Sequence, residues 1–182
     1  MKPITFTVLL GSLAFSTPAQ SATEPCSSAE FRQLDFWVGD WDLRYNQGPD
    51  KPKGKAHNTI TKHDFGDCVI TEHFTMPGFN GTSLSIFHKP TGQWRQTWVD
   101  DQGGYYDLIG GPAPKGADYD FGLELVHPDG IKAPYLRMIW QIKDKDHLVW
   151  RWQSHGGEDR GWKDRWVLNY TRVGIKDTNP AR

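Results

Sequence analysis

The chain of 182 residues has only two cysteines and no excess of charge of either sign. Its 21 Lys and Arg are balanced by 22 Asp and Glu, for a formal net charge of −1. This balance excludes both the basic surface of a typical nucleic-acid-binding protein and an acidic tail. Beyond the N-terminus, no segment has the roughly 18 apolar residues of a membrane helix. We therefore expect one globular domain with no nucleic-acid partner and no membrane span.

Common catalytic and metal-binding motifs are also absent. The sequence contains no G-x-S-x-G, H-E-x-x-H or G-x-x-x-x-G-K-[ST] motif. Two widely spaced cysteines make a poor zinc site, and the seven histidines occur singly. His57, His63 and His73 lie on neighbouring predicted strands and would form a three-histidine site only in a suitable register. We predict no metal and no cofactor.

The N-terminus resembles a secretory signal peptide. Lys2 precedes a short apolar run, and small residues follow it. We therefore predict a signal peptide over residues 1–22, cleaved after Ser21 or Ala22. The mature protein would be periplasmic or secreted.

In such an oxidising compartment we expect a disulfide between Cys26 and Cys68. It would join an N-terminal arm, residues 23–35, to the main domain. Two buried free thiols are the alternative. Within this region, residues 27–34 favour one or two helical turns, because Ser27 or Ser28 can cap a helix.

Turn residues and aromatic residues are abundant. The chain has 19 Gly, 12 Pro and nine Trp, and short apolar segments alternate with turn signals such as Asn80-Gly81. No helical crossover interrupts these segments, which excludes a parallel sheet. We predict about ten strands, over residues 40–45, 55–64, 68–76, 82–88, 93–101, 105–109, 118–126, 135–142, 147–154 and 162–172.

An antiparallel meander of this length protects its edges best by closing into a barrel. We predict an all-β, up-and-down barrel over residues 36–174, followed by a tail at 175–182. A barrel of this size can enclose one small ligand. A two-sheet sandwich with a solid core is the alternative.

The segment Gly39-Asp40-Trp41 resembles the G-x-W signature of the first strand in lipocalins and related calycin barrels. The runs 81–84 and 94–100 are similar to a family of exported bacterial domains of unknown function. The resemblance implies a calycin-like barrel, as in nitrobindin and the fatty-acid-binding proteins. It also implies that Trp41 closes the barrel floor beneath an arginine of the last strand, either Arg165 or Arg172.

Nitrobindin-like barrels bind heme through a histidine near the C-terminal end. This chain has no histidine after His155, which argues against heme unless His155 or another residue takes that place.

Two neighbouring residues, Glu72 and His73, are candidate catalytic groups. Because side chains alternate along a strand, one of them faces inward and the other outward. An inward Glu72 would have a raised pKa and serve as an acid or base, and an inward His73 would do the same near neutral pH. A surface Glu–His pair is the structural alternative.

Residues on three predicted strands are candidate ligand-binding groups, because rings combined with a few polar groups suit a ligand pocket. Gln96 and Trp98 share one strand face, although that face would also suit a surface ladder. Arg137 would bind an anion if buried, or stack on a Trp at the outer surface. The predicted ligand-binding residues are Gln96, Trp98, Arg137, Trp140, Trp150 and Gln153.

Three functions fit these patterns. The first is binding of a small hydrophobic or aromatic molecule by an exported barrel that is a monomer or a weak homodimer. The second is an enzyme, such as an isomerase, lyase or cyclase, that uses an inward Glu or His. The third is a partner-binding protein of the cell envelope that uses exposed Trp residues. The fold alone does not choose among them.

Overall fold

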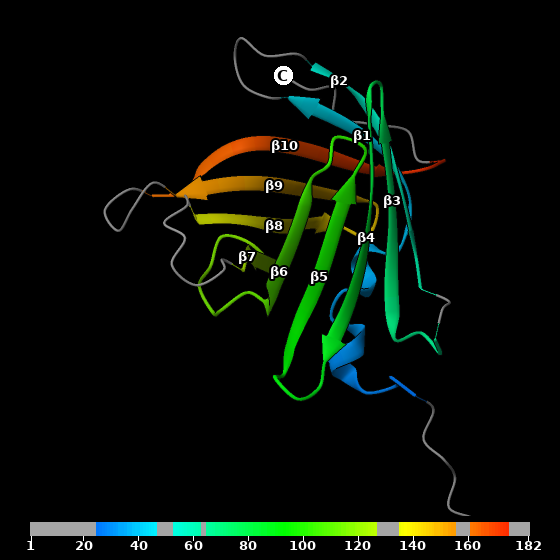
Figure 1. Ribbon diagram of the computed structural model, residues 1–182, viewed down its shortest axis with the longest axis vertical. Helices are drawn as coiled ribbons and strands as arrows, with labels where there is room; N and C mark the ends of the chain where they lie inside the picture. The colour runs from blue at the N-terminus through cyan, green and yellow to red at the C-terminus, as the bar shows by residue number, and fades with distance from the viewer. Residues whose placement is uncertain (1–24, 47–52, 63–64, 127–134, 156–160, 175–182) are drawn as a thin grey trace, which may run out of the picture.

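The computed structural model describes residues 25–46, 53–62, 65–126, 135–155 and 161–174. Ten antiparallel strands each pair with their neighbours in the chain, and pairing of the first with the last closes the barrel (Figure 1). The prediction of an all-β, up-and-down barrel is confirmed. The strands are β1 (Gly39–Asn46), β2 (Lys53–Thr61), β3 (Val69–Met76), β4 (Phe79–His88), β5 (Gln93–Asp100), β6 (Tyr105–Pro112), β7 (Phe121–Leu125), β8 (Tyr135–Asp144), β9 (His147–His155) and β10 (Lys163–Arg172).

The turn between β3 and β4 is not the predicted Asn80-Gly81. Met76 pairs with Phe79, so the loop consists of Pro77-Gly78, and Gly78 has a φ of 76°. Proline suits the first central position of such a turn and glycine the second, where φ is positive. Asn80 and Gly81 lie inside β4. The sequence therefore predicted this turn three residues too late.

Strand β7 is shorter than the predicted 118–126. Tyr119 leaves the strand and packs on the outside of the barrel, where its ring lies 5.0 Å from the Arg137 guanidinium. Its ring also approaches Gly122, at which any larger side chain would collide with it. A tertiary contact, which alternation along the strand does not encode, thus sets the start of β7.

The segment before β1 forms two short 3-10 helices, η1 (Ala29–Arg32) and η2 (Asp35–Trp37). Leu34 and Trp37 are almost fully buried in the barrel core. Ser28 occupies the N-cap position of η1, but its side chain makes no capping hydrogen bond. Figure 1 shows these helices in blue near the end of β4. The arm is therefore part of the core and covers one end of the barrel.

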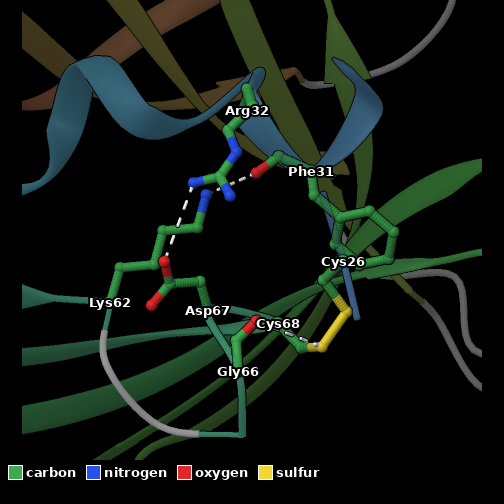
Figure 2. The surroundings of a disulfide bond; sticks show 7 residues. All are labelled: Cys26, Phe31, Arg32, Lys62, Gly66, Asp67 and Cys68. Atoms are coloured by element: carbon green, nitrogen blue, oxygen red, sulfur yellow. Dashed lines mark hydrogen bonds and ion pairs between the residues drawn. A yellow bond between two sulfur atoms is a disulfide. The ribbon is translucent and has the colours of Figure 1, made fainter. Parts of the chain in front are cut away.

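Two connections hold this arm in place (Figure 2). Cys26 and Cys68 form the predicted disulfide, with their Cα atoms 5.1 Å apart. The buried Lys62 donates a hydrogen bond to the Phe31 carbonyl oxygen at 2.5 Å and pairs with Asp35. The disulfide joins two cysteines that are 42 residues apart in the sequence. In the chain-entropy model, closing a loop of this length stabilises the fold by about 3–4 kcal/mol.

Trp41 and Arg172 close the barrel floor. The Arg172 guanidinium carbon lies 4.1 Å from the centre of the Trp41 ring, and its nitrogens donate to the carbonyl oxygens of Val38 and Lys145. Gly39 has a φ of 146°, and a Cβ atom there would lie 2.0 Å from the Arg172 side chain. The glycine of the G-x-W segment thus makes room for the arginine. Arg165 lies exposed at the bulge in β10, so the alternative assignment to Arg165 is wrong.

In the described residues, no helix has the length and apolar character required to cross a bilayer. The predicted signal peptide and the C-terminal tail lie outside these residues, as does His63.

Candidate functional site

The barrel contains a partly open cavity of about 190 Å³. Six of the nine tryptophans line it, so the aromatic surplus of the sequence is concentrated at one place. The cavity is lined by Trp37, Glu72, Phe74, Phe79, Trp98, Asp100, Tyr106, Leu108, Met138, Trp140, Trp150, Trp152, Trp166, Leu168 and Tyr170.

Strand alternation places these side chains. Trp150 and Trp152 are two apart on β9, and both line the cavity. Their indoles are nearly parallel, with an interplanar angle of 5°. The Trp166 ring lies almost perpendicular to that of Trp150, with centroids 5.9 Å apart. Because side chains alternate between the two faces of a strand, the charged and amide residues of β9 point to the outer face.

The rings form a continuous aromatic wall. Phe74 contacts both Trp98 and Trp166, with centroid distances of 6.2 and 5.7 Å. At the other end of the wall, Tyr106 packs against Trp152 at 5.6 Å. Deeper in the barrel, Trp37 and Trp140 meet edge to face at 5.3 Å. Such ring pairs bury large apolar areas and hold one another in fixed orientations.

A polar group interrupts this wall at Glu72, which is only 5% exposed. One carboxylate oxygen accepts a hydrogen bond from the Asn58 amide at 2.7 Å, and the other accepts from the Ser83 hydroxyl at 2.6 Å. The Asn58 amide also donates to the Tyr170 hydroxyl at 2.9 Å. No ion pair within the described residues includes Glu72. The carboxyl group is therefore held by neutral donors alone.

Burial raises the pKa of Glu72 to about 7, against the opposing effect of the hydrogen bonds from Ser83 and Asn58. Burial also raises the pKa of Tyr170, and the nearby Glu72 carboxylate adds to this shift. At neutral pH, Glu72 is thus close to half-ionised and can either give or accept a proton.

Asp100 is the second acid of the cavity and lies beside the β5–β6 turn. Burial pulls its pKa upward, but hydrogen bonds from the Trp98 indole and the N–H groups of Gly104 and Gln102 outweigh burial and lower it. The Trp98 Nε1 atom donates to Asp100 at 3.0 Å. The pKa values of the two acids of one cavity are therefore shifted in opposite directions.

The structure brings three of the predicted ligand-binding residues to this cavity, namely Trp98, Trp140 and Trp150. Gln96 also points into the barrel and is 1% exposed, but it lies outside the cavity lining and donates to Ser85 at 2.9 Å. Of the two candidate catalytic residues, Glu72 faces inward. His73 is exposed on the outer face, so the alternative in which His73 faces inward as the catalytic group is wrong.

Arg137 and Gln153 were predicted at the ligand site but lie on the outer face. Arg137 donates to the Gln153 side-chain oxygen at 2.7 Å, and its guanidinium stacks 4.1 Å from the Trp162 ring. Gln153 in turn donates to Asp164 at 2.9 Å. The alternative reading, an arginine stacked on a tryptophan outside the barrel, is the one the structure contains.

The cavity does not fit a heme held by histidine. None of the described histidines lines it, and the His155 ring packs outside the barrel against Tyr135 and Trp162. Among the described residues, no group of three His, Cys, Asp or Glu could hold a metal ion. His57 and His73 are both on the outer face, and His57 pairs with Asp40 at 2.8 Å.

The sequence interpretation missed Asn58 and Tyr170, which complete the polar group around Glu72. Asn58 lies between Ala56 and Ile60 on one face of β2 and is fully buried. The sequence did contain a signal for Asn58, because a polar residue with apolar residues two positions before and after it on a strand is expected to face the core. Tyr170 had no comparable signal, because tyrosine is as common on a strand surface as in a core.

The fold has a solved counterpart. The crystal structure of Rv2717c from M. tuberculosis matches with a TM-score of 0.52, covering 80% of this chain and 98% of that chain, at 16% identity. The two chains share a fold. At that identity the likeness extends no further than the barrel. The chain matches no protein-family model and no curated protein.

Proposed function

We propose that this protein binds a small hydrophobic or aromatic molecule in the tryptophan-lined cavity. The observation that carries the proposal is the convergence of six indoles on one cavity inside the barrel. A solid core would serve stability alone, whereas ligand pockets combine apolar walls with a few polar groups. An apolar cavity of roughly 150 Å³ accommodates benzene, so a cavity of about 190 Å³ suits a ligand with one ring and a short side arm.

Unpartnered polar atoms support the same function. The indole N–H of Trp140 is fully buried and has no hydrogen-bond partner among the described residues. A buried donor without a partner costs roughly 1–3 kcal/mol. A ligand atom that accepts a hydrogen bond from Trp140 would remove that cost.

Fluorescence titration tests the proposal, because indoles that contact a ligand change their emission. Wild-type protein is titrated with a panel of one-ring compounds, and the Trp98→Phe and Trp150→Phe variants are titrated alongside. Trp162→Phe is the matched control, since Trp162 lies on the outer face against Arg137. We expect saturable changes that weaken in the first two variants and persist in the control. Emission that no compound alters would refute binding.

A second candidate function is acid–base catalysis in the same cavity, favoured by the opposite pKa shifts of Glu72 and Asp100. Glu72 would transfer a proton to or from the bound molecule, as in an isomerase or lyase. Once a converted compound is found, Glu72→Gln should abolish turnover without loss of the folded barrel. Full activity of that variant would eliminate this candidate.

We further propose that the chain is exported and that its barrel is calycin-like. The Cys26–Cys68 disulfide suits an oxidising compartment. The floor built from Gly39, Trp41 and Arg172 supports the resemblance on which the calycin-like assignment rests.

A further inference from the structure

The cavity has an unbalanced charge. Of the described residues that line it, only Glu72 and Asp100 carry ionisable carboxyl groups, and none is a lysine, arginine or histidine. The two other ionisable side chains are the phenols of Tyr106 and Tyr170. An ionised Glu72 therefore places negative charge in an apolar space with no positive group beside it.

The described side chains that form the hydrogen-bonded group around Glu72 are all neutral. Asn58 on β2, Ser83 on β4 and Tyr170 on β10 surround its carboxyl group. Each carboxylate oxygen accepts one hydrogen bond from this group, while a carboxylate oxygen can accept more than one. A buried charge of this kind is costly unless a partner of opposite charge reaches it. The described protein residues do not supply that partner, but a ligand can.

The aromatic wall favours the same sign of charge. Rings of Trp, Tyr and Phe attract cations through the negative potential of their faces, and tryptophan does so most strongly. Six indoles, two phenylalanines and two tyrosines line the cavity together with the two carboxyl groups. Among the described lining residues, an anion would meet two acids and no basic side chain. Charge complementarity thus excludes an anionic ligand and favours a positive one.

We propose that the ligand is a small organic ammonium ion, with an apolar or aromatic body against the indoles and its positive nitrogen beside Glu72. This inference rests on the proposed function, because it names the chemical class of the ligand that the cavity binds. The nitrogen forms a charge-assisted hydrogen bond with the Glu72 carboxylate. The body fills the space between Trp98 and Trp150.

Three compounds of matched size test the charge directly: phenethylamine, 2-phenylethanol and 3-phenylpropionate. They are positive, neutral and negative, and each has one ring and a short arm. Their affinities for the full chain are measured at pH 8 by fluorescence titration and calorimetry. We expect phenethylamine to bind at least roughly tenfold more tightly than the alcohol, and the carboxylate to bind most weakly.

The Glu72→Gln variant should lose most of this preference while still binding the alcohol. Glu124→Gln is the matched control, since it removes the same charge from an exposed site on β7. Titration of wild-type protein at pH 5.5 gives the same information without a mutation. Protonation of Glu72 at that pH should reduce phenethylamine affinity and leave alcohol affinity unchanged.

Each outcome decides between the two proposals. If the alcohol or the carboxylate binds as tightly as phenethylamine, ligand binding stands and the cationic ligand is wrong. A preference that persists unchanged at pH 5.5 and in Glu72→Gln overturns the role of Glu72. If none of the three compounds nor any of the wider panel binds to folded protein, both proposals fail.

Discussion

Glu72 lies in an environment that is unusual for a carboxyl group. It lies inside an aromatic barrel, held by Asn58 and Ser83, and burial raises its pKa to about 7. At positions 72 and 73, alternation required one residue inside and one outside but did not determine which. The apolar neighbours on the same face, Ile70 and Phe74, are buried with Glu72 and show why it is the inward one.

The raised pKa of Glu72 makes stability depend on pH. Its pKa rises from an ordinary 4.5 to about 7 on folding, so the folded state disfavours ionisation. Below about pH 4.5 both states are protonated and this effect vanishes. As pH rises from 4.5 to 7, the unfolded state ionises first and stability falls by roughly 3 kcal/mol, with no further change above pH 7.

Urea unfolding of wild-type protein and Glu72→Gln from pH 4.5 to 8 measures this effect. The free energy of unfolding of the wild type, relative to the variant, should decrease across that range. Glu124→Gln should instead follow the wild type at every pH. If the difference in unfolding free energy between wild type and Glu72→Gln did not change with pH, Glu72 would not have a raised pKa in the folded state.

Arg172 and Arg165 are a matched pair at the ends of β10. Arg172→Lys keeps the charge but loses the planar contact with Trp41 and the shared hydrogen bonds to Lys145, so we expect a loss of about 1–3 kcal/mol of unfolding free energy. Arg165→Lys, at an exposed site, should change stability by less than about 0.5 kcal/mol. Thermal or urea unfolding measures both. Equal effects would show that Arg172 does not hold the floor.

At the scale of elements, β4 and β5 show how a strand positions the cavity wall. Ser83 pairs with Trp98 across the two strands, and Gly81 pairs with Asp100. Asn80-Gly81 predicted a turn because glycine is frequent in turns. In the structure Gly81 instead leaves room for a ring, since a Cβ atom there would lie 2.1 Å from the Trp98 side chain. Glycine occurs both in turns and at positions where a neighbouring ring needs space. The sequence alone does not tell which of the two reasons applies to Gly81.

Gly81→Ala should therefore displace the Trp98 indole from the cavity wall. We expect a loss of about 1–3 kcal/mol in unfolding free energy, an altered near-ultraviolet circular dichroism spectrum and weaker ligand binding. Gly111→Ala on β6 is the control, because no atom lies within 4 Å of its added Cβ. An unchanged spectrum and affinity in Gly81→Ala would mean that Trp98 does not need this space.

At the scale of the molecule, period-two alternation and regular turn signals were enough to predict ten strands and closure. They could not name the inner face, because a barrel has aromatic residues on both sides: Trp98 lines the cavity while Trp162 packs outside against Arg137. Arg137 and Gln153 were misplaced for that reason. The polar group around Glu72 joins β3 to three other strands of the closed barrel, through Asn58 on β2, Ser83 on β4 and Tyr170 on β10. Such contacts depend on the register between strands, which the sequence pattern does not give.

The central claim is that a small molecule binds among the indoles, and a crystal structure of the protein soaked with the tightest compound of the panel tests it most directly. We predict ligand density inside the barrel between Trp98 and Trp150, within hydrogen-bonding distance of Glu72. Ligand density confined to the outer surface near Arg137 would contradict the account. So would an empty cavity in crystals soaked with compounds that bind in solution.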